Sequence, residues 1–383
     1  MTKILILTAG YGEGHNSAAR ALTAAFNEHS ATSVAEVIDV FALRAPRLNH
    51  VSRRAYLGLI NRAPKVWAGV YRWLDRSPNA PQLFRTLASH KNLLARLIAE
   101  HEPSAIVSTY PVYPWLLNEL RRDGLLPCPH FTVVTDALTI NSLWYRAPSD
   151  GWFVTDEDSA RLMRAAGVPA QKVFVSGFPV ARSFADRPAH WQPPELFLGG
   201  TKRILFIINS GQQRALATAR ALLLCKDWHI TFTTGRDASL HAEITAQAHR
   251  TPASSEVLGW TDRIPELLMT HHAAISKAGG ATTQESINAL CPLLVNQIVP
   301  GQEEGNYELL RRAGAGALTE TPRAVVDTLH AAFAHDALLW LQWRAHLRRL
   351  ARPDAARDIA RHVLRHADNW AGFPEPVITL KTA

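Results

Sequence analysis

The chain has 383 residues, 47% of them hydrophobic, a length that suits two ordinary domains, each with its own core. No run of about 18 uncharged apolar residues is present, so we expect no transmembrane helix. The N-terminus, MTKILILTAG, lacks the features of a signal peptide. Cys128, Cys225 and Cys291 form no CxxC pair and indicate neither disulfides nor a zinc site. The net charge of +8 suits nucleic acid, an anionic membrane or a phosphorylated substrate as partner.

Short apolar segments alternate with helical segments through the first half of the chain. We expect a strand at 3–9, then a glycine loop and a helix over 16–29. Further strands are expected at 34–40, 104–109, 130–136, 151–155 and 172–177. This alternation is typical of a parallel, doubly wound α/β sheet. It stops at the proline- and glycine-rich stretch 187–200, which is typical of a linker.

The same alternation restarts after the linker. Strands are expected at 203–211, 228–235, 254–260, 272–280 and 292–297, with helices between them. The domain prediction is therefore an N-terminal domain at 1–187, a linker at 188–201 and a C-terminal domain at 202–352. Residues 353–383 are expected to form a helix and a tail, which could return to the N-terminal domain.

A glycine-rich loop follows the first expected strand. Gly10, Gly12 and Gly14 precede His15, and glycines there let backbone N–H groups approach a polar ligand at the positive end of a helix. Asp39, at the end of the second strand, makes a NAD-dependent oxidoreductase an alternative, although the spacing GxGxGH differs from GxGxxG. His15 could also be a helix residue with no chemical role.

A second glycine cluster, SKAGGATTQE from Ser276, also follows an apolar strand and opens a helix. Its glycines would admit a diphosphate against the helix N-terminus. Thr282 and Thr283 could donate hydroxyl hydrogen bonds, and Glu285 could accept from the hydroxyls of a ribose. Thr282-x-x-Glu285 also fits a capping box, and both interpretations stay open. Downstream, the loop PGQEEGN carries groups suited to sugar hydroxyls, or it is a solvated acidic loop.

These stretches resemble the monogalactosyldiacylglycerol synthase and processive diacylglycerol glucosyltransferase family, of glycosyltransferase family 28. The similarity lies in ILILTAGYGEGHNSAARAL, VVTD with the following W and DGWFV, VLGWTDRIPELL, SKAGGATTQES and PLLVNQIVPGQEEGN, and it covers most of residues 1–365. The resemblance implies the GT-B fold, with two Rossmann-like domains facing a central cleft. It implies inverting, metal-independent transfer of a hexose from a UDP-sugar to a lipid acceptor such as diacylglycerol, with no cofactor.

The resemblance also assigns residues to roles. His15 matches the histidine of the family's glycine loop and is the expected general base, with Asp136 as the second catalytic residue. The acceptor side includes Gly12, Gly14, Asn141 and Trp144. The residues expected to bind the donor are Gly211, Gly259, Trp260, Ser276, Lys277, Gly279, Gly280, Thr282, Thr283, Glu285, Gly301, Gln302, Glu303 and Asn306.

Two departures from the family pattern stand out. Asn141 lies near the place where relatives usually carry a histidine after the Thr-Asp pair, so acceptor recognition or the partner of Asp136 could differ. The glycine-rich loop after the first strand of the second domain is reduced here to Asn209-Ser210-Gly211-Gln212.

Residues 44–98 carry eleven basic side chains against one acid, Asp75, with tryptophans and tyrosines among them. Such a mixture suits an anionic membrane interface, and we expect peripheral attachment to the cytoplasmic face of the membrane. The residues expected there are Arg53, Arg54, Lys65, Trp67, Arg72 and Trp73. A solvated basic face is the alternative, whereas a nucleic-acid partner is not expected because no such motif accompanies the segment.

Three classes of function stand beside one another at this point. The first is the lipid glycosyltransferase, with transfer of N-acetylglucosamine from its UDP conjugate to a polyprenyl-linked or other lipid as a variant. The second is the NAD-dependent oxidoreductase. The third is a noncatalytic protein that binds a nucleotide sugar. The sequence leaves open the sugar, the lipid, the processivity of transfer and the oligomeric state.

Overall fold

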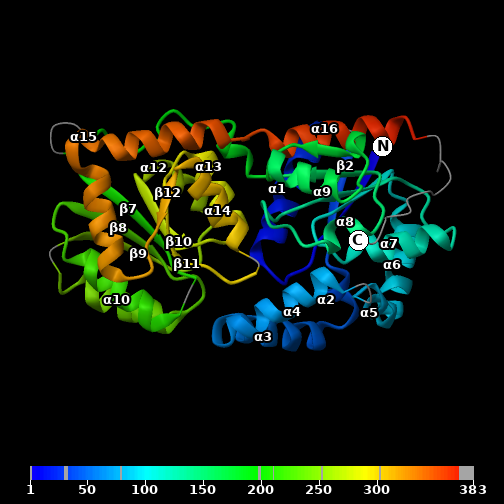
Figure 1. The fold of residues 1–383 in the computed structure, drawn as a ribbon, viewed down its shortest axis with the longest axis horizontal. Helices are drawn as coiled ribbons and strands as arrows, with labels where there is room; N and C mark the ends of the chain where they lie inside the picture. The colour runs from blue at the N-terminus through cyan, green and yellow to red at the C-terminus, as the bar shows by residue number, and fades with distance from the viewer. Residues whose placement is uncertain are drawn as a thin grey trace. The chain divides into compact units, whose positions relative to one another are not determined.

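The computed structural model describes residues 2–29, 33–77, 80–196, 200–209, 211–251, 253–301 and 303–370. The chain forms two compact units, and each is described by itself. The first contains residues 1–182, 300–305 and 352–383, and the second contains residues 183–299 and 306–351. Within the described residues each unit holds one six-stranded sheet in which every pairing is parallel (Figure 1). The predicted fold class, GT-B with two Rossmann-like domains, is confirmed at the level of these two sheets.

The first sheet has the strand order β2-β1-β3-β4-β5-β6. Its strands are β1 (Thr2–Leu7), β2 (Ser33–Ile38), β3 (Ala105–Ser108), β4 (His130–Val133), β5 (Gly151–Val154) and β6 (Val173–Val175). β3, β4 and β5 are buried along their whole length, as expected of strands covered by helices on both faces, whereas the edge strand β2 is buried only in part. All six strands were predicted from their apolar runs.

Helices cover both faces of this sheet. Ile4 and Ile6 of β1 pack in one core with residues of α1 (Glu13–His29) and α16 (Ala355–Asp368), and Leu5 and Leu7 pack in another. Figure 1 shows α16 (red) beside α1 (blue), so the end of the chain is part of the first unit. The other helices around this sheet are α6 (Ala88–His101), α7 (Tyr113–Arg122), α8 (Leu143–Arg146) and α9 (Glu157–Ala165), with short 3-10 turns at Ala170–Lys172 and Arg182–Phe184.

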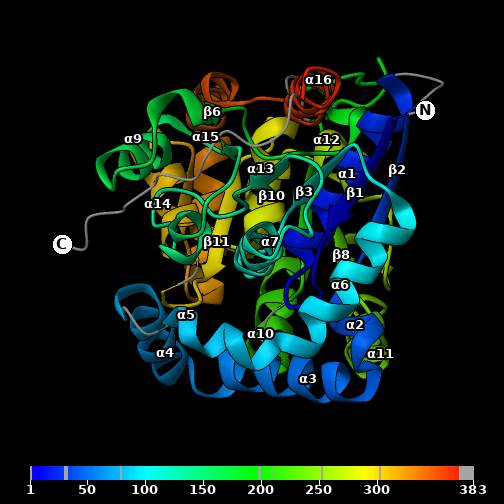
Figure 2. The ribbon, with the colours of Figure 1, turned by 90° about the vertical axis from the view of Figure 1, so that its right-hand side faces the viewer.

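A group of helices replaces the simple crossover between β2 and β3. It comprises α2 (Val40–Arg44), α3 (Pro46–Arg62), α4 (Pro64–Arg76), α5 (Ala80–Leu83) and the 3-10 turn Phe84–Leu87, and it leads into α6. Figure 2 shows α2 to α6 gathered together. Pro46 and Pro64 each stand at the first position of their helix, where proline has no N–H to lose. This group contains the basic aromatic segment.

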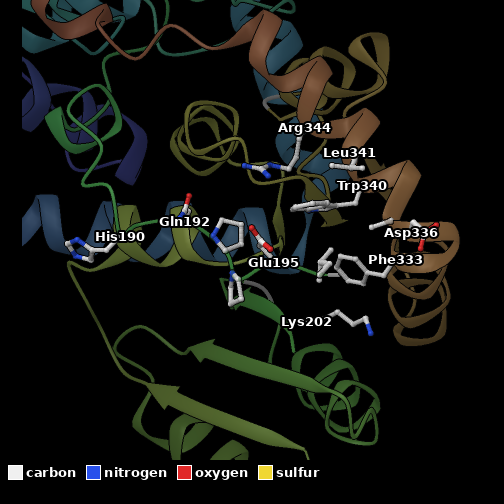
Figure 3. Close-up of a pocket in the computed structure, with 13 residues that line it drawn as sticks. His190, Gln192, Glu195, Lys202, Phe333, Asp336, Trp340, Leu341 and Arg344 are labelled. Carbon is white, nitrogen blue, oxygen red and sulfur yellow. The ribbon is translucent and has the colours of Figure 1, made fainter. Parts of the chain in front are cut away.

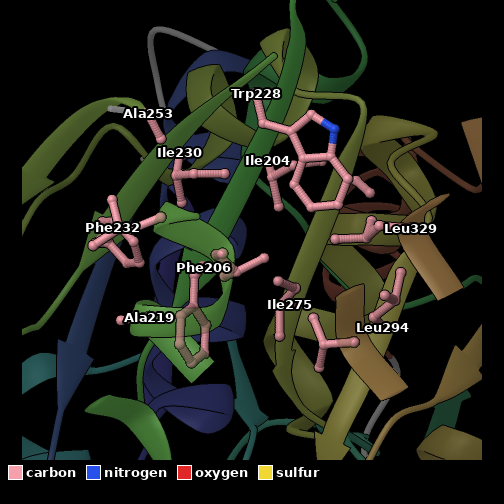
Figure 4. Packing of buried hydrophobic residues seen from close by; sticks show 14 of the residues in the cluster. Ile204, Phe206, Ala219, Trp228, Ile230, Phe232, Ala253, Ile275, Leu294 and Leu329 are labelled. Carbon is pink, nitrogen blue, oxygen red and sulfur yellow. The ribbon is translucent and has the colours of Figure 1, made fainter. Parts of the chain in front are cut away.

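The second sheet has the order β12-β11-β10-β7-β8-β9. Its strands are β7 (Lys202–Ile207), β8 (Trp228–Thr233), β9 (Ser254–Leu258), β10 (Ala273–Lys277), β11 (Leu293–Gln297) and β12 (Gly316–Leu318). The helices are α10 (Gln212–Leu223), α11 (Ala238–Ala248), α12 (Ile264–Thr270), α13 (Gly280–Ala289), α14 (Glu304–Ala313) and α15 (Pro322–Leu350). Figure 4 shows the core, where Trp228, Ile204 and Leu329 pack together.

Each strand order contains a topological switch point, where successive crossovers diverge to opposite sides of one strand. In the first sheet this point lies between β1 and β3, and in the second it lies between β7 and β10. Ligands of open α/β sheets bind outside the carboxyl ends of the strands at this point. Both glycine clusters follow strands at these two switch points, β1 and β10, so topology and sequence indicate the same places.

Candidate active site

The first glycine loop joins β1 to α1 at the switch point of the first sheet. Asp39 closes it: one carboxylate oxygen accepts from Gly10 N at 3.0 Å, and the other accepts from Ala42 N at 2.9 Å. Asp39 is also the N-cap of α2. Both oxygens of Asp39 thus have a structural role, in holding the loop and capping α2, that needs no ribose. The carboxylate that suggested a dinucleotide therefore has a structural explanation within the loop.

The imidazole of His15 lies in the first turn of α1, one residue after Gly14. Its Nδ1 lies 3.0 Å from Oγ1 of Thr135, and its backbone carbonyl accepts from Oγ1 of Thr109 at 3.2 Å. The ring of Tyr110 stands edge-on to it, with the centroids 5.1 Å apart. The residue is 8% exposed, and this burial lowers the pKa of His15 to about 4. The imidazole is therefore neutral at pH 7.

Gly12 lies beside the other edge of the same ring. A Cβ built at position 12 would lie 3.6 Å from Cδ2 and 3.9 Å from Nε2 of His15. The lack of a side chain at Gly12 thus leaves the Nε2 edge of the imidazole uncovered from this direction. A general base needs such an open nitrogen within hydrogen-bond reach of its substrate.

Asp136 lies at the carboxyl end of β4 and is held by two side chains. Its Oδ2 accepts from Nε1 of Trp144 at 2.9 Å and from the hydroxyl of Tyr71 at 3.4 Å. Burial raises the pKa of Asp136 to about 6, although both hydrogen bonds oppose the shift. The Trp144 ring lies 5.9 Å from the His15 ring, centroid to centroid. His15, Asp136 and Trp144, predicted from separate parts of the sequence, therefore come together.

Asn141 forms hydrogen bonds with backbone groups and not with the Asp136 carboxylate. Its Nδ2 donates to the carbonyl of Tyr71 at 3.2 Å, and its Oδ1 accepts from Leu143 N at 3.0 Å. The sequence did not single out Thr135 or Tyr71 as site residues. Thr135 directly precedes Asp136 and could have been found from that adjacency, whereas Tyr71 comes from α4, whose packing no local pattern reveals.

The second glycine cluster joins β10 to α13 at the switch point of the second sheet. Gly279 is the N-cap of α13, and no side chain caps the helix at this residue. Thr282 is the third residue of the helix, not its cap, so the capping-box interpretation is wrong. The positive end of α13, with Gly280 in its first turn, is thus left for a ligand. Thr282 and Glu285 are both partly exposed within the first two turns.

Polar side chains lie around this helix end. Ser276 Oγ donates to the Ile207 carbonyl at 3.2 Å and lies 3.2 Å from Nδ2 of Asn209, which ties β10 to β7 at the switch point. Asn306 Nδ2 donates to the carbonyl of Ala278 at 2.9 Å. Among the described residues, the buried hydroxyl of Thr283 and Oδ1 of Asn306 have no hydrogen-bond partner. Buried polar atoms are normally paired, so these two are candidates for ligand contacts.

The remaining predicted donor residues lie at strand ends or in loops. Lys277 ends β10, and Gly211 is the N-cap of α10, which follows β7. Gly259 and Trp260 follow β9; the indole is 65% exposed and lies 5.7 Å from Cζ of Arg236. Gly301 has a φ of +86°, which requires glycine, and it belongs with Glu303 to the segment Pro300–Gly305 of the first unit. Gln302 lies outside the described residues.

The predicted membrane residues lie on α3 and α4. Arg53, Arg54, Lys65 and Arg72 are exposed, but Arg53 also reaches the glycine loop, since a Cβ at Gly10 would lie 2.8 Å from its guanidinium. Trp73 is 51% exposed and borders an open groove of about 450 Å³ with Arg72 and Arg76. Trp67 is only partly exposed, and its ring packs against Tyr56 and Tyr71. In the described part of the chain, no helix is long and apolar enough to cross a bilayer.

A separate cavity of about 800 Å³ lies at the amino end of β7, away from the switch point of the second sheet. Figure 3 shows it between Trp340 and Arg344 of α15 and Glu195 of the preceding segment. Trp340 Nε1 donates to the carbonyl of His272, and Arg344 Nε donates to the carbonyl of Leu290 at 3.2 Å. Trp340 and Arg344 are thus engaged in holding the residues that flank β10 and α13.

Comparison with known proteins finds similarity to enzymes that are named for glycolipid synthesis. Residues 15–180 match the family model described as monogalactosyldiacylglycerol (MGDG) synthase. The chain is 24% identical over 370 residues to processive diacylglycerol beta-glucosyltransferases of Bacillus thuringiensis (strain Al Hakam) and Bacillus cereus (strain AH820), covering 94% of this chain and 93% of each relative.

Solved structures share the fold. MnaA of S. aureus with UDP has a TM-score of 0.64 at 12% identity and covers 98% of this chain and 100% of that chain. Acinetobacter baumannii MurG has a TM-score of 0.60 at 13% identity and covers 95% of this chain and 100% of that chain. The UDP-GlcNAc 2-epimerase from Neisseria meningitidis bound to UDP-GlcNAc has a TM-score of 0.60 at 12% identity and covers 95% and 100%.

Proposed function

We propose that this chain is a glycosyltransferase that moves a hexose from a UDP-sugar to a diacylglycerol-type lipid. It resembles MGDG synthases over residues 15–180 and processive diacylglycerol glucosyltransferases along nearly its whole length. The observation that carries the proposal is the pair of switch-point sites. One presents a neutral imidazole whose Nε2 faces a glycine without a side chain, suited to a hydroxyl acceptor. The other presents an uncapped helix N-terminus, suited to a diphosphate.

The donor is proposed to bind at α13. The backbone N–H groups of its first turn would bind the diphosphate, and Lys277 would add a positive charge. Glu285, one turn further along, would accept from the ribose hydroxyls, and the unpaired groups of Thr283 and Asn306 would bind the donor. Because these groups can stabilise the leaving UDP, we propose that the active site needs no metal ion and no cofactor.

The reaction is proposed to be a single displacement at the anomeric carbon. The acceptor hydroxyl oxygen forms a bond to that carbon while its proton moves to Nε2 of His15. The bond between the anomeric carbon and the phosphate oxygen breaks, and its electron pair leaves with UDP. One displacement on one face inverts the anomeric configuration, so an α-linked donor gives a β-linked glycolipid.

Membrane docking is proposed for the exposed faces of α3 and α4, on the cytoplasmic side of an anionic bilayer. Cations near such a surface contribute about 1 kcal/mol each, and Trp73 suits headgroup depth. Reversal of Arg54, Lys65 and Arg72 to Glu should release the protein from phosphatidylglycerol vesicles in a flotation assay. Reversal of the exposed Arg220, Lys226 and Arg250 changes the net charge equally and should not. Equal retention of both triple variants would contradict this docking surface.

A donor and acceptor panel tests the activity itself. UDP-glucose, UDP-galactose and UDP-N-acetylglucosamine would each be offered with diacylglycerol or with polyprenyl phosphate in vesicles, and products read by mass spectrometry. We expect a hexosyl-diacylglycerol whose β configuration is visible by NMR and whose formation persists in EDTA. Binding of UDP without product from any pair would support a noncatalytic nucleotide-sugar protein instead. Product only from the N-acetylglucosamine and polyprenyl pair would support the variant reaction.

A further inference from the structure

The ring of His15 has a hydroxyl, not a carboxylate, at Nδ1. Oγ1 of Thr135 lies 3.0 Å from this nitrogen, and the two residues are 3% and 8% exposed. The carboxylate next in sequence, Asp136, has its Oδ2 bound to Trp144 and Tyr71 instead. The partner that orients the imidazole is therefore neutral.

A hydroxyl can donate or accept, so this contact selects between two tautomers of the imidazole. If Thr135 donates, the ring proton sits on Nε2, and that nitrogen cannot accept a proton from a substrate. If Nδ1–H donates to Oγ1, the lone pair of Nε2 is free on the edge of the ring beside Gly12. Proton transfer at Nε2 needs the second arrangement.

We infer that Thr135 is a positioning residue that accepts a hydrogen bond from Nδ1–H of His15 and so keeps the base-competent tautomer in place. This inference rests on the proposed function for its catalytic consequence. In the transfer step the acceptor hydroxyl proton moves to Nε2 as its oxygen bonds to the anomeric carbon and UDP departs with the bonding pair. The imidazole is then protonated on both nitrogens, and Nδ1–H keeps its bond to Thr135.

Other contacts of His15 hold its backbone, so removal of the Thr135 hydroxyl should affect the imidazole and not the helix. The carbonyl of His15 is held independently by the Thr109 hydroxyl at 3.2 Å, and Tyr110 packs edge-on against the imidazole at 5.1 Å. The imidazole also has a hydrogen-bonding contact with the backbone of Thr109, which opposes the lowering of its pKa. Loss of the Thr135 hydroxyl should therefore leave the ring in its cage but weaken the selection of its tautomer. A carboxylate at this position would favour the charged imidazolium, whereas a hydroxyl orients the ring and leaves it neutral.

The test combines a spectroscopic and a kinetic measurement. In protein with ¹⁵N-labelled histidine, the signals lost in His15→Gln identify His15, and its nitrogen shifts report the tautomer. We expect Nδ1–H in the native protein and in Thr135→Ser, and a mixture of tautomers in Thr135→Val, which keeps the shape but not the hydroxyl. The rate at saturating substrates should fall roughly 10- to 100-fold in Thr135→Val and recover in Thr135→Ser.

A double-mutant cycle distinguishes a positioning role of Thr135 from a purely structural one. In a His15→Ala background, Thr135→Val should cost little further rate, because the two residues act as a unit. An Nε2–H tautomer in the native protein would overturn the inference without any variant being needed. Equal losses from Thr135→Val in the native and His15→Ala backgrounds would do the same. If no UDP-sugar is turned over at all, the proposed function fails, while the tautomer measurement still decides the role of Thr135.

Discussion

Substitution of Gly12 by alanine probes the open edge of the imidazole. The added methyl would lie 3.6 Å from Cδ2 and 3.9 Å from Nε2 of His15, which is ordinary van der Waals contact, so the fold should accept it. An acceptor oxygen, however, must approach Nε2 to about 2.6–3.2 Å. A methyl on that side would push the acceptor outward, and a misplacement of about 1 Å can lower the rate about 100-fold.

The assay is steady-state transfer to diacylglycerol in vesicles, beside calorimetric UDP binding and thermal unfolding. Gly12→Ala should lower the rate roughly 10- to 100-fold, with UDP affinity and the melting temperature unchanged. Gly69→Ala, on α4, is the matched control, because nothing lies within 4 Å of its new methyl. Full activity of Gly12→Ala at saturating acceptor would refute the assignment of the Nε2 edge as the place where the acceptor is deprotonated.

Four further outcomes can be measured with the same assays. His15→Ala should lower the maximal rate by roughly 10²–10⁴ while leaving UDP affinity intact, and a full rate would move the base elsewhere. Asp136→Asn keeps an acceptor for Trp144 and Tyr71 but removes the charge, so it should lower the rate at pH 7 more than at pH 5, where the native carboxyl is largely protonated and both proteins are neutral at this position. Thr283→Val should weaken UDP binding by about 0.5–1.5 kcal/mol without lowering the stability of the free protein, since the hydroxyl has no partner among the described residues. Finally, the lowered pKa of His15, about 4, means that the unfolded chain binds its proton first as the pH falls below 6.5. Stability should therefore drop between pH 6.5 and 4, by up to about 3 kcal/mol from this group, and His15→Gln should flatten that part of a urea-unfolding series.

Much of the fold was predictable because parallel strands buried on both faces are continuous apolar runs. Eleven of the twelve strands in the described part of the chain were expected from such runs, including all those that flank the switch points. β12 escaped because Gly316–Leu318 is too short to form a pattern. The helices α2 to α6 were identified only as a basic aromatic segment, because their boundaries depend on packing between helices rather than on one periodicity.

The candidate site was predictable where it follows strand ends and hidden where it depends on tertiary contacts. His15, Asp136 and the α13 cluster all follow apolar strands. Their positions at the carboxyl ends of the strands, in the first sheet for His15 and Asp136 and in the second for α13, could therefore be inferred from topology. Thr135 could have been noticed as the neighbour of Asp136, but its pairing with His15 could not, because the two residues are 120 positions apart and meet only when β4 packs beside β3. The capping box was predicted wrongly for a local reason: Gly279 is the N-cap and α13 begins at Gly280, so Thr282 falls inside the helix.

Burial disfavours the charged form of both His15 and Asp136. It lowers the pKa of the imidazole to about 4 and raises that of the carboxyl to about 6. At pH 7 the imidazole is therefore neutral, as a base must be, while Asp136 stays ionised with Trp144 and Tyr71 as donors. Trp144 contacts both groups, so the carboxylate lies near the ring that becomes positive when it takes the acceptor proton. In the proposed mechanism Asp136 would stabilise the charge that forms during transfer, and Thr135 would set the tautomer. Two residues would then share the two tasks that one carboxylate performs in a Ser-His-Asp triad.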